Sequence, residues 1–301
     1  MTAPDPLAGL LEVLDLQPIE VNIFRGRSPD DDLRQRVFGG QVAGQALVAA
    51  GRTVDADRRV HSLHAYFLRP GDPAIPILYE VDRIRDGRSF TTRRVVAIQH
   101  GEAIFHLSAS FHVDEPGFEH STPMPDVPRP DDLPTWEERM KALEGQVPAW
   151  FARPRPIDTR FVQQPWRAPT GGNAAQREPG QEVQRREPRQ EVWMRAKGTL
   201  PDDPLLHACV VAYASDMTLL DSVVMPHRDV VLSGRLMMAS LDHAMWFHAP
   251  LRADEWFLYD QESPNASGAR GLAQGRIFRS DGALAVSVVQ EGLVRLVGGH
   301  R

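Results

Sequence analysis

The chain has 301 residues, 42% hydrophobic residues and a formal net charge of -6, the composition of an ordinary globular protein with one large core or two smaller ones. The negative charge argues against a nonspecific nucleic-acid binder, and no segment is long and apolar enough to span a bilayer. Cys209 is the single cysteine, which excludes a disulfide framework and a cysteine-based zinc site. Since the N-terminal residues also lack the features of a signal peptide, we expect a cytoplasmic protein.

The first part of the chain predicts two helices and several strands. Leucines at helical spacing indicate an amphipathic helix over residues 5–15, and alternating apolar and polar residues indicate a strand over 19–23. Residues 37–51 are small and apolar enough to form a buried helix. From 60 to 113, turn signals divide four strand-like segments. This part is therefore predicted to be an antiparallel meander that follows a helix.

The middle of the chain predicts a connection between two structured parts. Proline-rich sequence over residues 115–134 indicates a linker, and residues 135–143 favour a short helix. Strands are expected at 157–162 and 191–198. Between them, residues 168–190 are polar, rich in glycine and proline and nearly without apolar residues, which predicts a disordered loop.

The segment that follows reads as one buried helix with a misplaced charge. Asp203 is a good N-cap, Pro204 a good first helical residue, and Pro226 closes the segment. Most residues between them are apolar, so the carboxylate of Asp216 would be costly unless it has a partner. A structural hydrogen bond and a functional role both explain such a residue. Cys209 is not expected to be a nucleophile, because apolar burial raises the pKa of a thiol.

The two strand-rich regions resemble each other at a constant spacing. Four pairs of anchors lie 180 residues apart: Tyr66-Phe67 with Trp246-Phe247, Pro70 with Pro250, Tyr79 with Tyr259, and Ala103-Ile104 with Ala283-Leu284. Each half therefore predicts a curved antiparallel sheet wrapped around one long buried helix. This is an α+β double hotdog with a continuous sheet. We expect an N-terminal hotdog over residues 1–114, a linker with a short helix over 115–156, and a C-terminal hotdog over 157–301.

Polar residues also interrupt two later strand segments, Ser240-Leu241-Asp242-His243 and Val288-Val289-Gln290-Glu291-Gly292. With these segments the chain resembles the acyl-CoA thioesterase II family, the TesB-like double-hotdog enzymes. The resemblance covers nearly the whole chain, in family order, and departs from it at residues 168–190. Its motifs are LRQRVFGGQVAGQAL, HSLHAYFLRPGD, RDGRSFTTRRVVAIQHG, GFEH, YASDMTLL, SLDHAMWFH and VVQEG.

The resemblance implies an enzyme that hydrolyses fatty acyl-CoA with an activated water molecule. The family's aspartate falls on Asp216, its hydroxyl on Ser240, where threonine is common, and its amide on Gln290. Serine supplies the same donor and acceptor as threonine. No cofactor or metal is implied, and the family suggests a homo-oligomer. The first predicted buried helix offers Gln41 and Gln45 in place of a carboxylate, so we expect the first half to be catalytically silent.

The chemistry of these three residue types agrees with that assignment. A thioester carbonyl is already electrophilic, so the enzyme chiefly has to aim a water molecule and stabilise the oxyanion. Asp216 can accept a proton from the water, while Ser240 and Gln290 fix its orientation. Backbone N–H groups near a helix start are candidates for the oxyanion donors, although the sequence does not identify them.

Two alternative functions stay open at this stage. A hotdog enoyl-CoA hydratase also places an acid next to a thioester, but it pairs the aspartate with a nearby histidine, and here Met-Thr-Leu-Leu-Asp-Ser follows Asp216. A non-catalytic acyl-CoA binding protein would not need all three polar positions.

Other hydrolase and metal chemistries find little support in the sequence. A serine hydrolase would need a G-x-S-x-G elbow, which does not occur. The histidines His64, His243 and His248 lack metal-binding spacing and favour structural roles. The C-terminal Gly-Gly-His-Arg is not a peroxisomal signal, which fits the expected cytoplasmic location.

Overall fold

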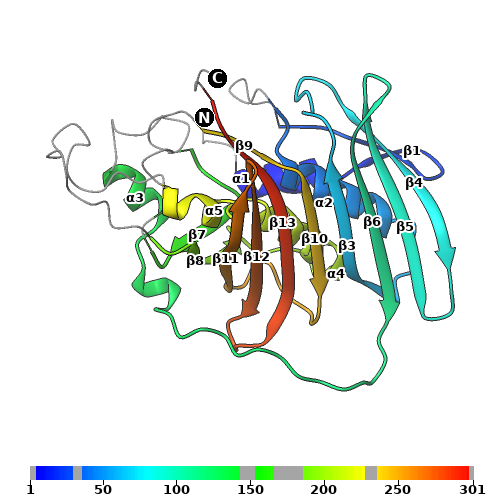
Figure 1. The fold of residues 1–301 in the computed structure, drawn as a ribbon. Coiled ribbons are helices and arrows are strands. Elements are labelled where there is room, and N and C mark those ends of the chain that lie inside the picture. Colours follow the sequence, from blue (N-terminus) through cyan, green and yellow to red (C-terminus); the bar gives the residue numbers. More distant parts are fainter. Residues whose placement is uncertain are drawn as a thin grey trace, which may run out of the picture.

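The computed structural model describes residues 5–29, 36–142, 153–163, 165, 186–227 and 236–297. Its main feature is one large antiparallel sheet that curves around two helices (Figure 1). The strands are β1 (Gln17–Glu20), β2 (Ile23–Gly26), β3 (Arg58–Phe67), β4 (Ile77–Asp86), β5 (Phe90–Gln99), β6 (Glu102–Val113), β7 (Ile157–Phe161), β8 (Arg189–Ala196), β9 (Leu236–Ser240), β10 (Asp242–Phe247), β11 (Phe257–Ser267), β12 (Arg270–Arg279) and β13 (Leu284–Leu296). The α-helices are α1 (Pro6–Leu14), α2 (Gly39–Gly51), α3 (Trp136–Ala142), α4 (Pro204–Ser215) and α5 (Asp221–Val224), and 3-10 turns span Pro130–Asp132 and Met225–His227.

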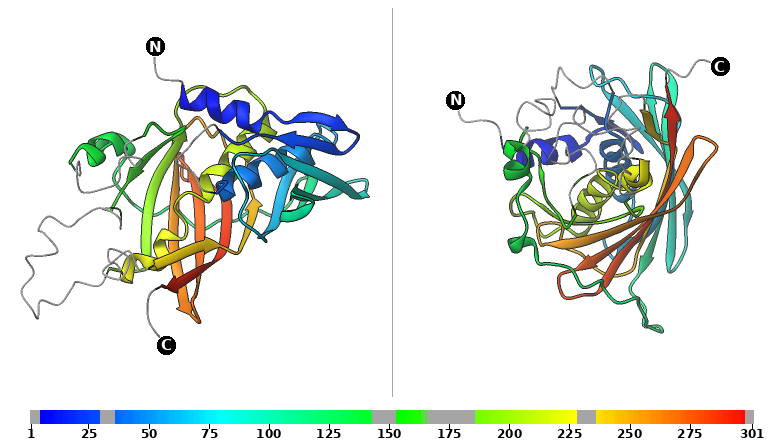
Figure 2. Two further views of the ribbon diagram at one scale, coloured as in Figure 1. Left: turned by 90° about the horizontal axis from the view of Figure 1, so that it is seen from above. Right: turned by 60° about the vertical axis from the view of Figure 1, so that its left-hand side comes forward.

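The strand order is the same in both halves, read from the two edges of the sheet towards its centre. The order is β1-β2-β4-β5-β6-β3-β10-β13-β12-β11-β8-β7, with β9 pairing with β13. The halves join where β3 pairs with β10, with Ala65 opposite His243. Helices α2 and α4 pack against each other inside the curve of the sheet (Figure 2). The structure thus has the predicted double hotdog architecture.

The register of the strands tests the 180-residue repeat directly. Tyr79 lies opposite Ala97, and Tyr259 opposite Ile277, so the spacing of 180 holds across these two pairs of strands. Ile98 lies opposite Ala103, whereas Phe278 lies opposite Leu284. The spacing therefore becomes 181 in the last strand, and Ala103 corresponds to Leu284 rather than to Ala283.

Several predicted elements need correction. Residues 19–23 form no single strand, because the chain turns at Asn22, whose φ of 62° is left-handed, and β1 and β2 make a hairpin. The four strands of the first half are no simple meander either. Only β4, β5 and β6 follow one another in the sheet, and β3 lies on the far side of β6. β3 thereby fills the central position that joins the halves.

The connection between the halves is described in part. The predicted short helix is α3, whose Trp136 and Met140 are buried. Residues 168–185 of the expected disordered loop lie outside the described residues. The loop was predicted to run two residues too far, because β8 already begins at Arg189 and Gln190 is buried within it.

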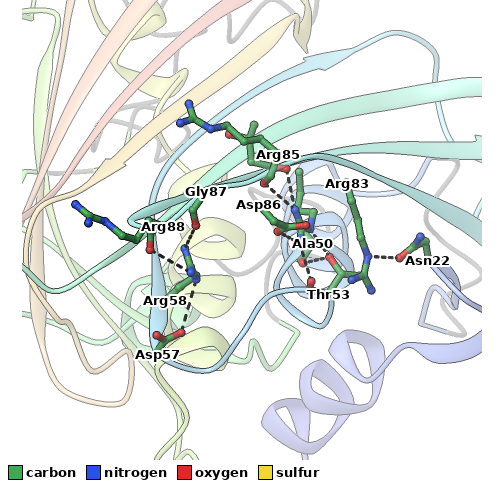
Figure 3. Close-up of polar contacts among 12 residues, drawn as sticks. Asn22, Ala50, Thr53, Asp57, Arg58, Arg83, Arg85, Asp86, Gly87 and Arg88 are labelled. Atoms are coloured by element: carbon green, nitrogen blue, oxygen red, sulfur yellow. Dashed lines mark hydrogen bonds and ion pairs between the residues drawn. The ribbon is translucent and has the colours of Figure 1, made fainter.

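A buried arginine holds the C-terminal end of α2 to the sheet. Arg93 on β5 is 1% exposed and donates to the hydroxyl and the carbonyl oxygen of Thr53, two residues beyond α2. It also pairs with Asp86 at 2.6 Å. Thr53 and Asp86 are drawn in Figure 3, together with the neighbouring contacts of Arg58. A cation at the C-terminus of a helix also complements the helix dipole. α2 is therefore fixed at the end remote from the site described below.

Candidate active site

Asp216 does not lie inside a helix, contrary to the sequence prediction. α4 begins as expected, with the Asp203 carboxylate accepting from Leu205 N–H at 2.9 Å, but it ends at Ser215. Asp216 is its C-cap, and the chain turns until α5 begins at Asp221. The Tyr259 hydroxyl donates to the Ser215 carbonyl oxygen at 3.2 Å, which satisfies one of the acceptors that a helix end leaves unpaired.

The structure brings the three predicted site residues together at one carboxylate oxygen. Gln290 on β13 donates its Nε2–H to Asp216 Oδ1 at 2.6 Å. Ser240, the last residue of β9, donates its hydroxyl to the same oxygen at 3.1 Å. β9 pairs with β13, and Ser240 lies opposite Gly292, which is why residues 50 positions apart meet here. Gln290 is fully buried, whereas Asp216 and Ser240 are half-buried.

The environment shifts the acidity of Asp216 toward neutral pH. Burial raises the pKa of this carboxyl from 3.8 to about 6, against the opposing effect of hydrogen bonds from Gln290, Ser240 and the backbone N–H of Gly40. The C-terminus of α4, where Asp216 lies, is the negative end of that helix dipole and also disfavours a carboxylate. A base whose pKa lies near the working pH is well suited to proton transfer.

The start of α2, in the other half of the protein, also borders the site. The N-cap residue Phe38 makes no side-chain hydrogen bond to this helix, and the Asp216 carboxylate accepts from Gly40 N–H instead. A Cβ atom on Gly39 would lie 2.7 Å from Asp216 Oδ2 and 2.8 Å from a ring carbon of Phe67. Only glycine permits this approach. The sequence showed these glycines as a packing feature and did not indicate that they border the site.

One polar atom in the site has no partner. Gln290 Oε1 is buried and accepts no hydrogen bond from any residue that the structure describes. Buried acceptors are nearly always paired, so an unpaired one beside a carboxylate indicates a position for a bound water or substrate group.

The first half lacks the corresponding polar groups. Val60 opposite Phe111 occupies the place of Ser240 opposite Gly292, and Ala109 occupies the place of Gln290. Gln45 is fully buried and donates to the carbonyl oxygens of Val13 at 2.6 Å and Arg27 at 2.9 Å. It also accepts from the Tyr79 hydroxyl at 2.6 Å. All its hydrogen-bonding atoms are thus used to hold the fold.

A cavity of about 960 Å³ lies where a second site would be expected from the repeat. It is at the end of the helix pair where α2 finishes and α4 begins, and Gly51, Leu205, Val60 and Phe111 contribute to its lining. Because Val60 stands there in place of Ser240, this cavity does not reproduce the arrangement around Asp216.

The remaining candidate residues have structural contacts. His243 is fully buried, burial lowers its pKa to about 4, and its Nε2 lies 2.8 Å from Ser215 Oγ. His248 bonds Ser287 at 2.9 Å, and the ring of His64 packs edge-on against Trp246. Burial raises the pKa of the Cys209 thiol. Among the described residues no cluster of His, Cys, Asp and Glu could hold a metal ion.

The fold and the site together define a class of protein. It is a double hotdog protein whose site combines one carboxylate, one hydroxyl and one amide. A hot dog fold protein from Alicyclobacillus acidocaldarius matches 96% of the chain with a TM-score of 0.75 at 18% identity, which shows the fold alone. Family models described as "Acyl-CoA thioesterase" and "Acyl-CoA thioesterase N-terminal domain" match residues 160–293 and 28–112. The chain belongs to the acyl-CoA thioesterase family.

Relatives that match over most of their own length support this assignment. Acyl-coenzyme A thioesterase 8 of Mus musculus is 43% identical over 94% of this chain and 88% of its own length. Acyl-CoA thioesterase 2 of Haemophilus influenzae is 39% identical over 97% of this chain and 98% of its own. The acyl-CoA thioesterase II TesB2 structure from Mycobacterium marinum is 46% identical, with a TM-score of 0.77 over 97% of this chain and 100% of that chain. In the described part of the chain, no helix has the length and apolar character needed to cross a membrane.

Proposed function

We propose that this acyl-CoA thioesterase hydrolyses fatty acyl-CoA with a water molecule activated by Asp216 and oriented by Ser240 and Gln290. The observation that carries the proposal is the meeting of Ser240 and Gln290 on one oxygen of a carboxylate whose pKa is raised to about 6. The water would donate one hydrogen to Asp216 and the other to the unpaired Oε1 of Gln290. This orientation aims its lone pair at the thioester.

The proposed reaction needs no covalent enzyme intermediate. The water oxygen attacks the carbonyl carbon while Asp216 takes a proton, which gives a tetrahedral oxyanion. When this intermediate collapses, the carbon–sulfur bond breaks and the proton passes from Asp216 to the departing sulfur. The products are a free fatty acid and coenzyme A.

The start of α2 is the best candidate for the oxyanion site. Gly40 N–H is taken by Asp216, but Gly39 N–H has no acceptor among the described residues. A backbone N–H at the positive end of a helix dipole is well placed to stabilise developing negative charge. Both halves would then contribute to one site, the second with the base and the first with the oxyanion donor.

Product analysis distinguishes this function from the two alternatives. Incubation with palmitoyl-CoA should release free coenzyme A, detected with a thiol reagent. A 2-enoyl-CoA should give no 3-hydroxyacyl-CoA by chromatography, whereas a hydratase would form it and a binding protein would form neither product. Homo-oligomerisation stays a prediction that rests on the family, and a cytoplasmic location stays a prediction that rests on the sequence.

A further inference from the structure

Two buried glutamines from the sheet hold the turn that follows Asp216. Gln190 on β8 donates its Nε2–H to the Thr218 carbonyl oxygen at 2.8 Å and to Gln261 Oε1 at 2.8 Å. Gln261 on β11 in turn donates to the Thr218 hydroxyl at 2.8 Å. Gln190, Gln261 and Thr218 are 1%, 0% and 5% exposed. The three side chains form a closed network two residues beyond Asp216, which we call the Thr218 network.

The first half holds the residue beyond its helix with an arginine instead of two glutamines. Gln261 and Gln190 lie opposite each other on adjacent strands. In the first half, Val81 occupies the position of Gln261, 180 residues earlier, and it is a buried core residue. There, α2 ends at Gly51, and Arg93 donates to the hydroxyl and the carbonyl oxygen of Thr53 beyond it. Buried polar side chains therefore hold the turn beyond the helix in both halves, but only the half with Asp216 uses two glutamine amides for this purpose.

Stability alone does not account for the two amides. Gln190 Oε1 is buried and has no donor among the described residues, which destabilises the folded state. Partly satisfied polar groups in a core are less favourable than apolar side chains that fill the same space. The neighbouring core of the first half shows that valine fits such a position.

We propose that Gln190, Gln261 and Thr218 are positioning residues that set the direction of the Asp216 carboxylate. This inference rests on the proposed function of Asp216. Asp216 lies between two fixed points, Ser215, whose carbonyl accepts from Tyr259, and Thr218. Without the hydrogen bonds to Thr218, the turn can rotate about Ser215. Since the base must reach a small water molecule, a displacement of about 1 Å at this point costs activity on the order of 10²-fold.

The test compares substitutions that differ by one polar group. Thr218→Val removes the hydroxyl at constant shape, Thr218→Ser keeps it, and Gln261→Met removes an amide of similar length. Thr218→Val and Gln261→Met should lower kcat for palmitoyl-CoA hydrolysis by roughly 10- to 100-fold at nearly unchanged KM. They should also move the acid limb of the pH profile, because the hydrogen bonds to Asp216 change. Thr218→Ser should restore most of the activity.

A buried glutamine of the first half provides the matched control. Gln99 is 4% exposed, donates to the carbonyl oxygens of Asp72 and Ile75, and accepts from Asp72 N–H. Gln99→Met should lower Tm at least as much as Gln261→Met and leave kcat and the pH profile of the folded enzyme unchanged. If Gln99→Met lowered kcat as much as Gln261→Met does, the loss of activity would come from general destabilisation, and the proposal would be wrong.

The outcome for Asp216 separates this inference from the proposed function. If Asp216→Asn is inactive while folded Thr218→Val and Gln261→Met keep full kcat and the same pH profile, only the positioning role is refuted. If Asp216→Asn itself keeps full activity, the proposed function fails first. Should Gln261→Met not fold, Thr218→Val with its serine counterpart decides the question.

Discussion

Asp216, at the C-terminus of α4, accepts a hydrogen bond from the backbone N–H of Gly40, the second residue of α2. One side chain of the second hotdog thereby caps the helix of the first, which has no side-chain N-cap of its own. The contact places the proposed base beside the positive end of a helix dipole. It also makes the geometry of the site depend on both halves.

The pH dependence follows from the raised pKa of Asp216. The base acts only when deprotonated, so kcat/KM should rise with pH through an apparent pKa of about 6. Gln290 donates to Asp216 and lowers its pKa, so Gln290→Met should move this limb to higher pH. Initial rates from pH 4.5 to 8.5 measure the apparent pKa of the wild-type enzyme and its shift in Gln290→Met. A limb that moved to lower pH in Gln290→Met would contradict the assigned hydrogen bond.

Gly39 should tolerate no side chain. The Cβ of alanine would lie 2.7 Å from Asp216 Oδ2 and 2.8 Å from Phe67, so the start of α2 must shift away from the carboxylate. We expect Gly39→Ala to lower kcat by at least about 10-fold. Gly9→Ala in α1 is the matched control, since nothing lies within 4 Å of its Cβ, and it should keep wild-type kcat. Equal kcat values for the two variants would count against the proposed site.

Gln45 should matter for stability rather than for chemistry. Gln45→Met leaves the Tyr79 hydroxyl and the carbonyl oxygens of Val13 and Arg27 without their partner in a buried region. We expect a loss of about 2–4 kcal/mol in the free energy of unfolding, since each buried unpaired group costs about 1–3 kcal/mol. Denaturant unfolding measures this loss. A fall in kcat as large as that of Asp216→Asn at unchanged KM would show that the first half takes part in the chemical step.

Ser240 and Gln290 should not act independently. Both hold the same carboxylate oxygen, so the double variant Ser240→Ala/Gln290→Met should lose less transition-state stabilisation than the two single losses added together. A double-mutant cycle on kcat/KM measures the difference. Ser240→Ala combined with Gln99→Met is the control, and these two effects should add. Additivity in both cycles would argue against joint action of Ser240 and Gln290 on Asp216.

Much of the fold could be predicted from the sequence because its signals are local or repeated. The leucine spacing predicted α1, and the small apolar residues predicted α2. The 180-residue repeat predicted the two similar halves of the sheet. The pairing of β3 with β6 and β10 could not be predicted, since strand order depends on contacts between distant residues. The extra residue before β13 was missed for a different reason: Asp281-Gly282 signals a turn, but this signal does not fix the length of the loop.

The site residues came from the family resemblance together with the misplaced charge at Asp216. The break of the helix at Asp216 escaped prediction because its cause is distant: Tyr259, Gln190 and Gln261 pair with the backbone and side chain of the turn. Gln190 itself was assigned to a disordered loop on its polar neighbours alone. A polar residue that is buried by tertiary contacts has no distinguishing pattern in a single sequence.

The substitution Asp216→Asn tests the central claim most directly, because it keeps the size of the side chain and removes the base. Release of coenzyme A from palmitoyl-CoA, measured at saturating substrate with circular dichroism as the check on folding, should show kcat reduced by about 10²- to 10⁴-fold. Ser240→Ala and Gln290→Ala should each cost less, since a misaimed water can still be deprotonated. A folded Asp216→Asn enzyme with wild-type kcat would contradict the account and return Asp216 to a structural role as the cap of α2.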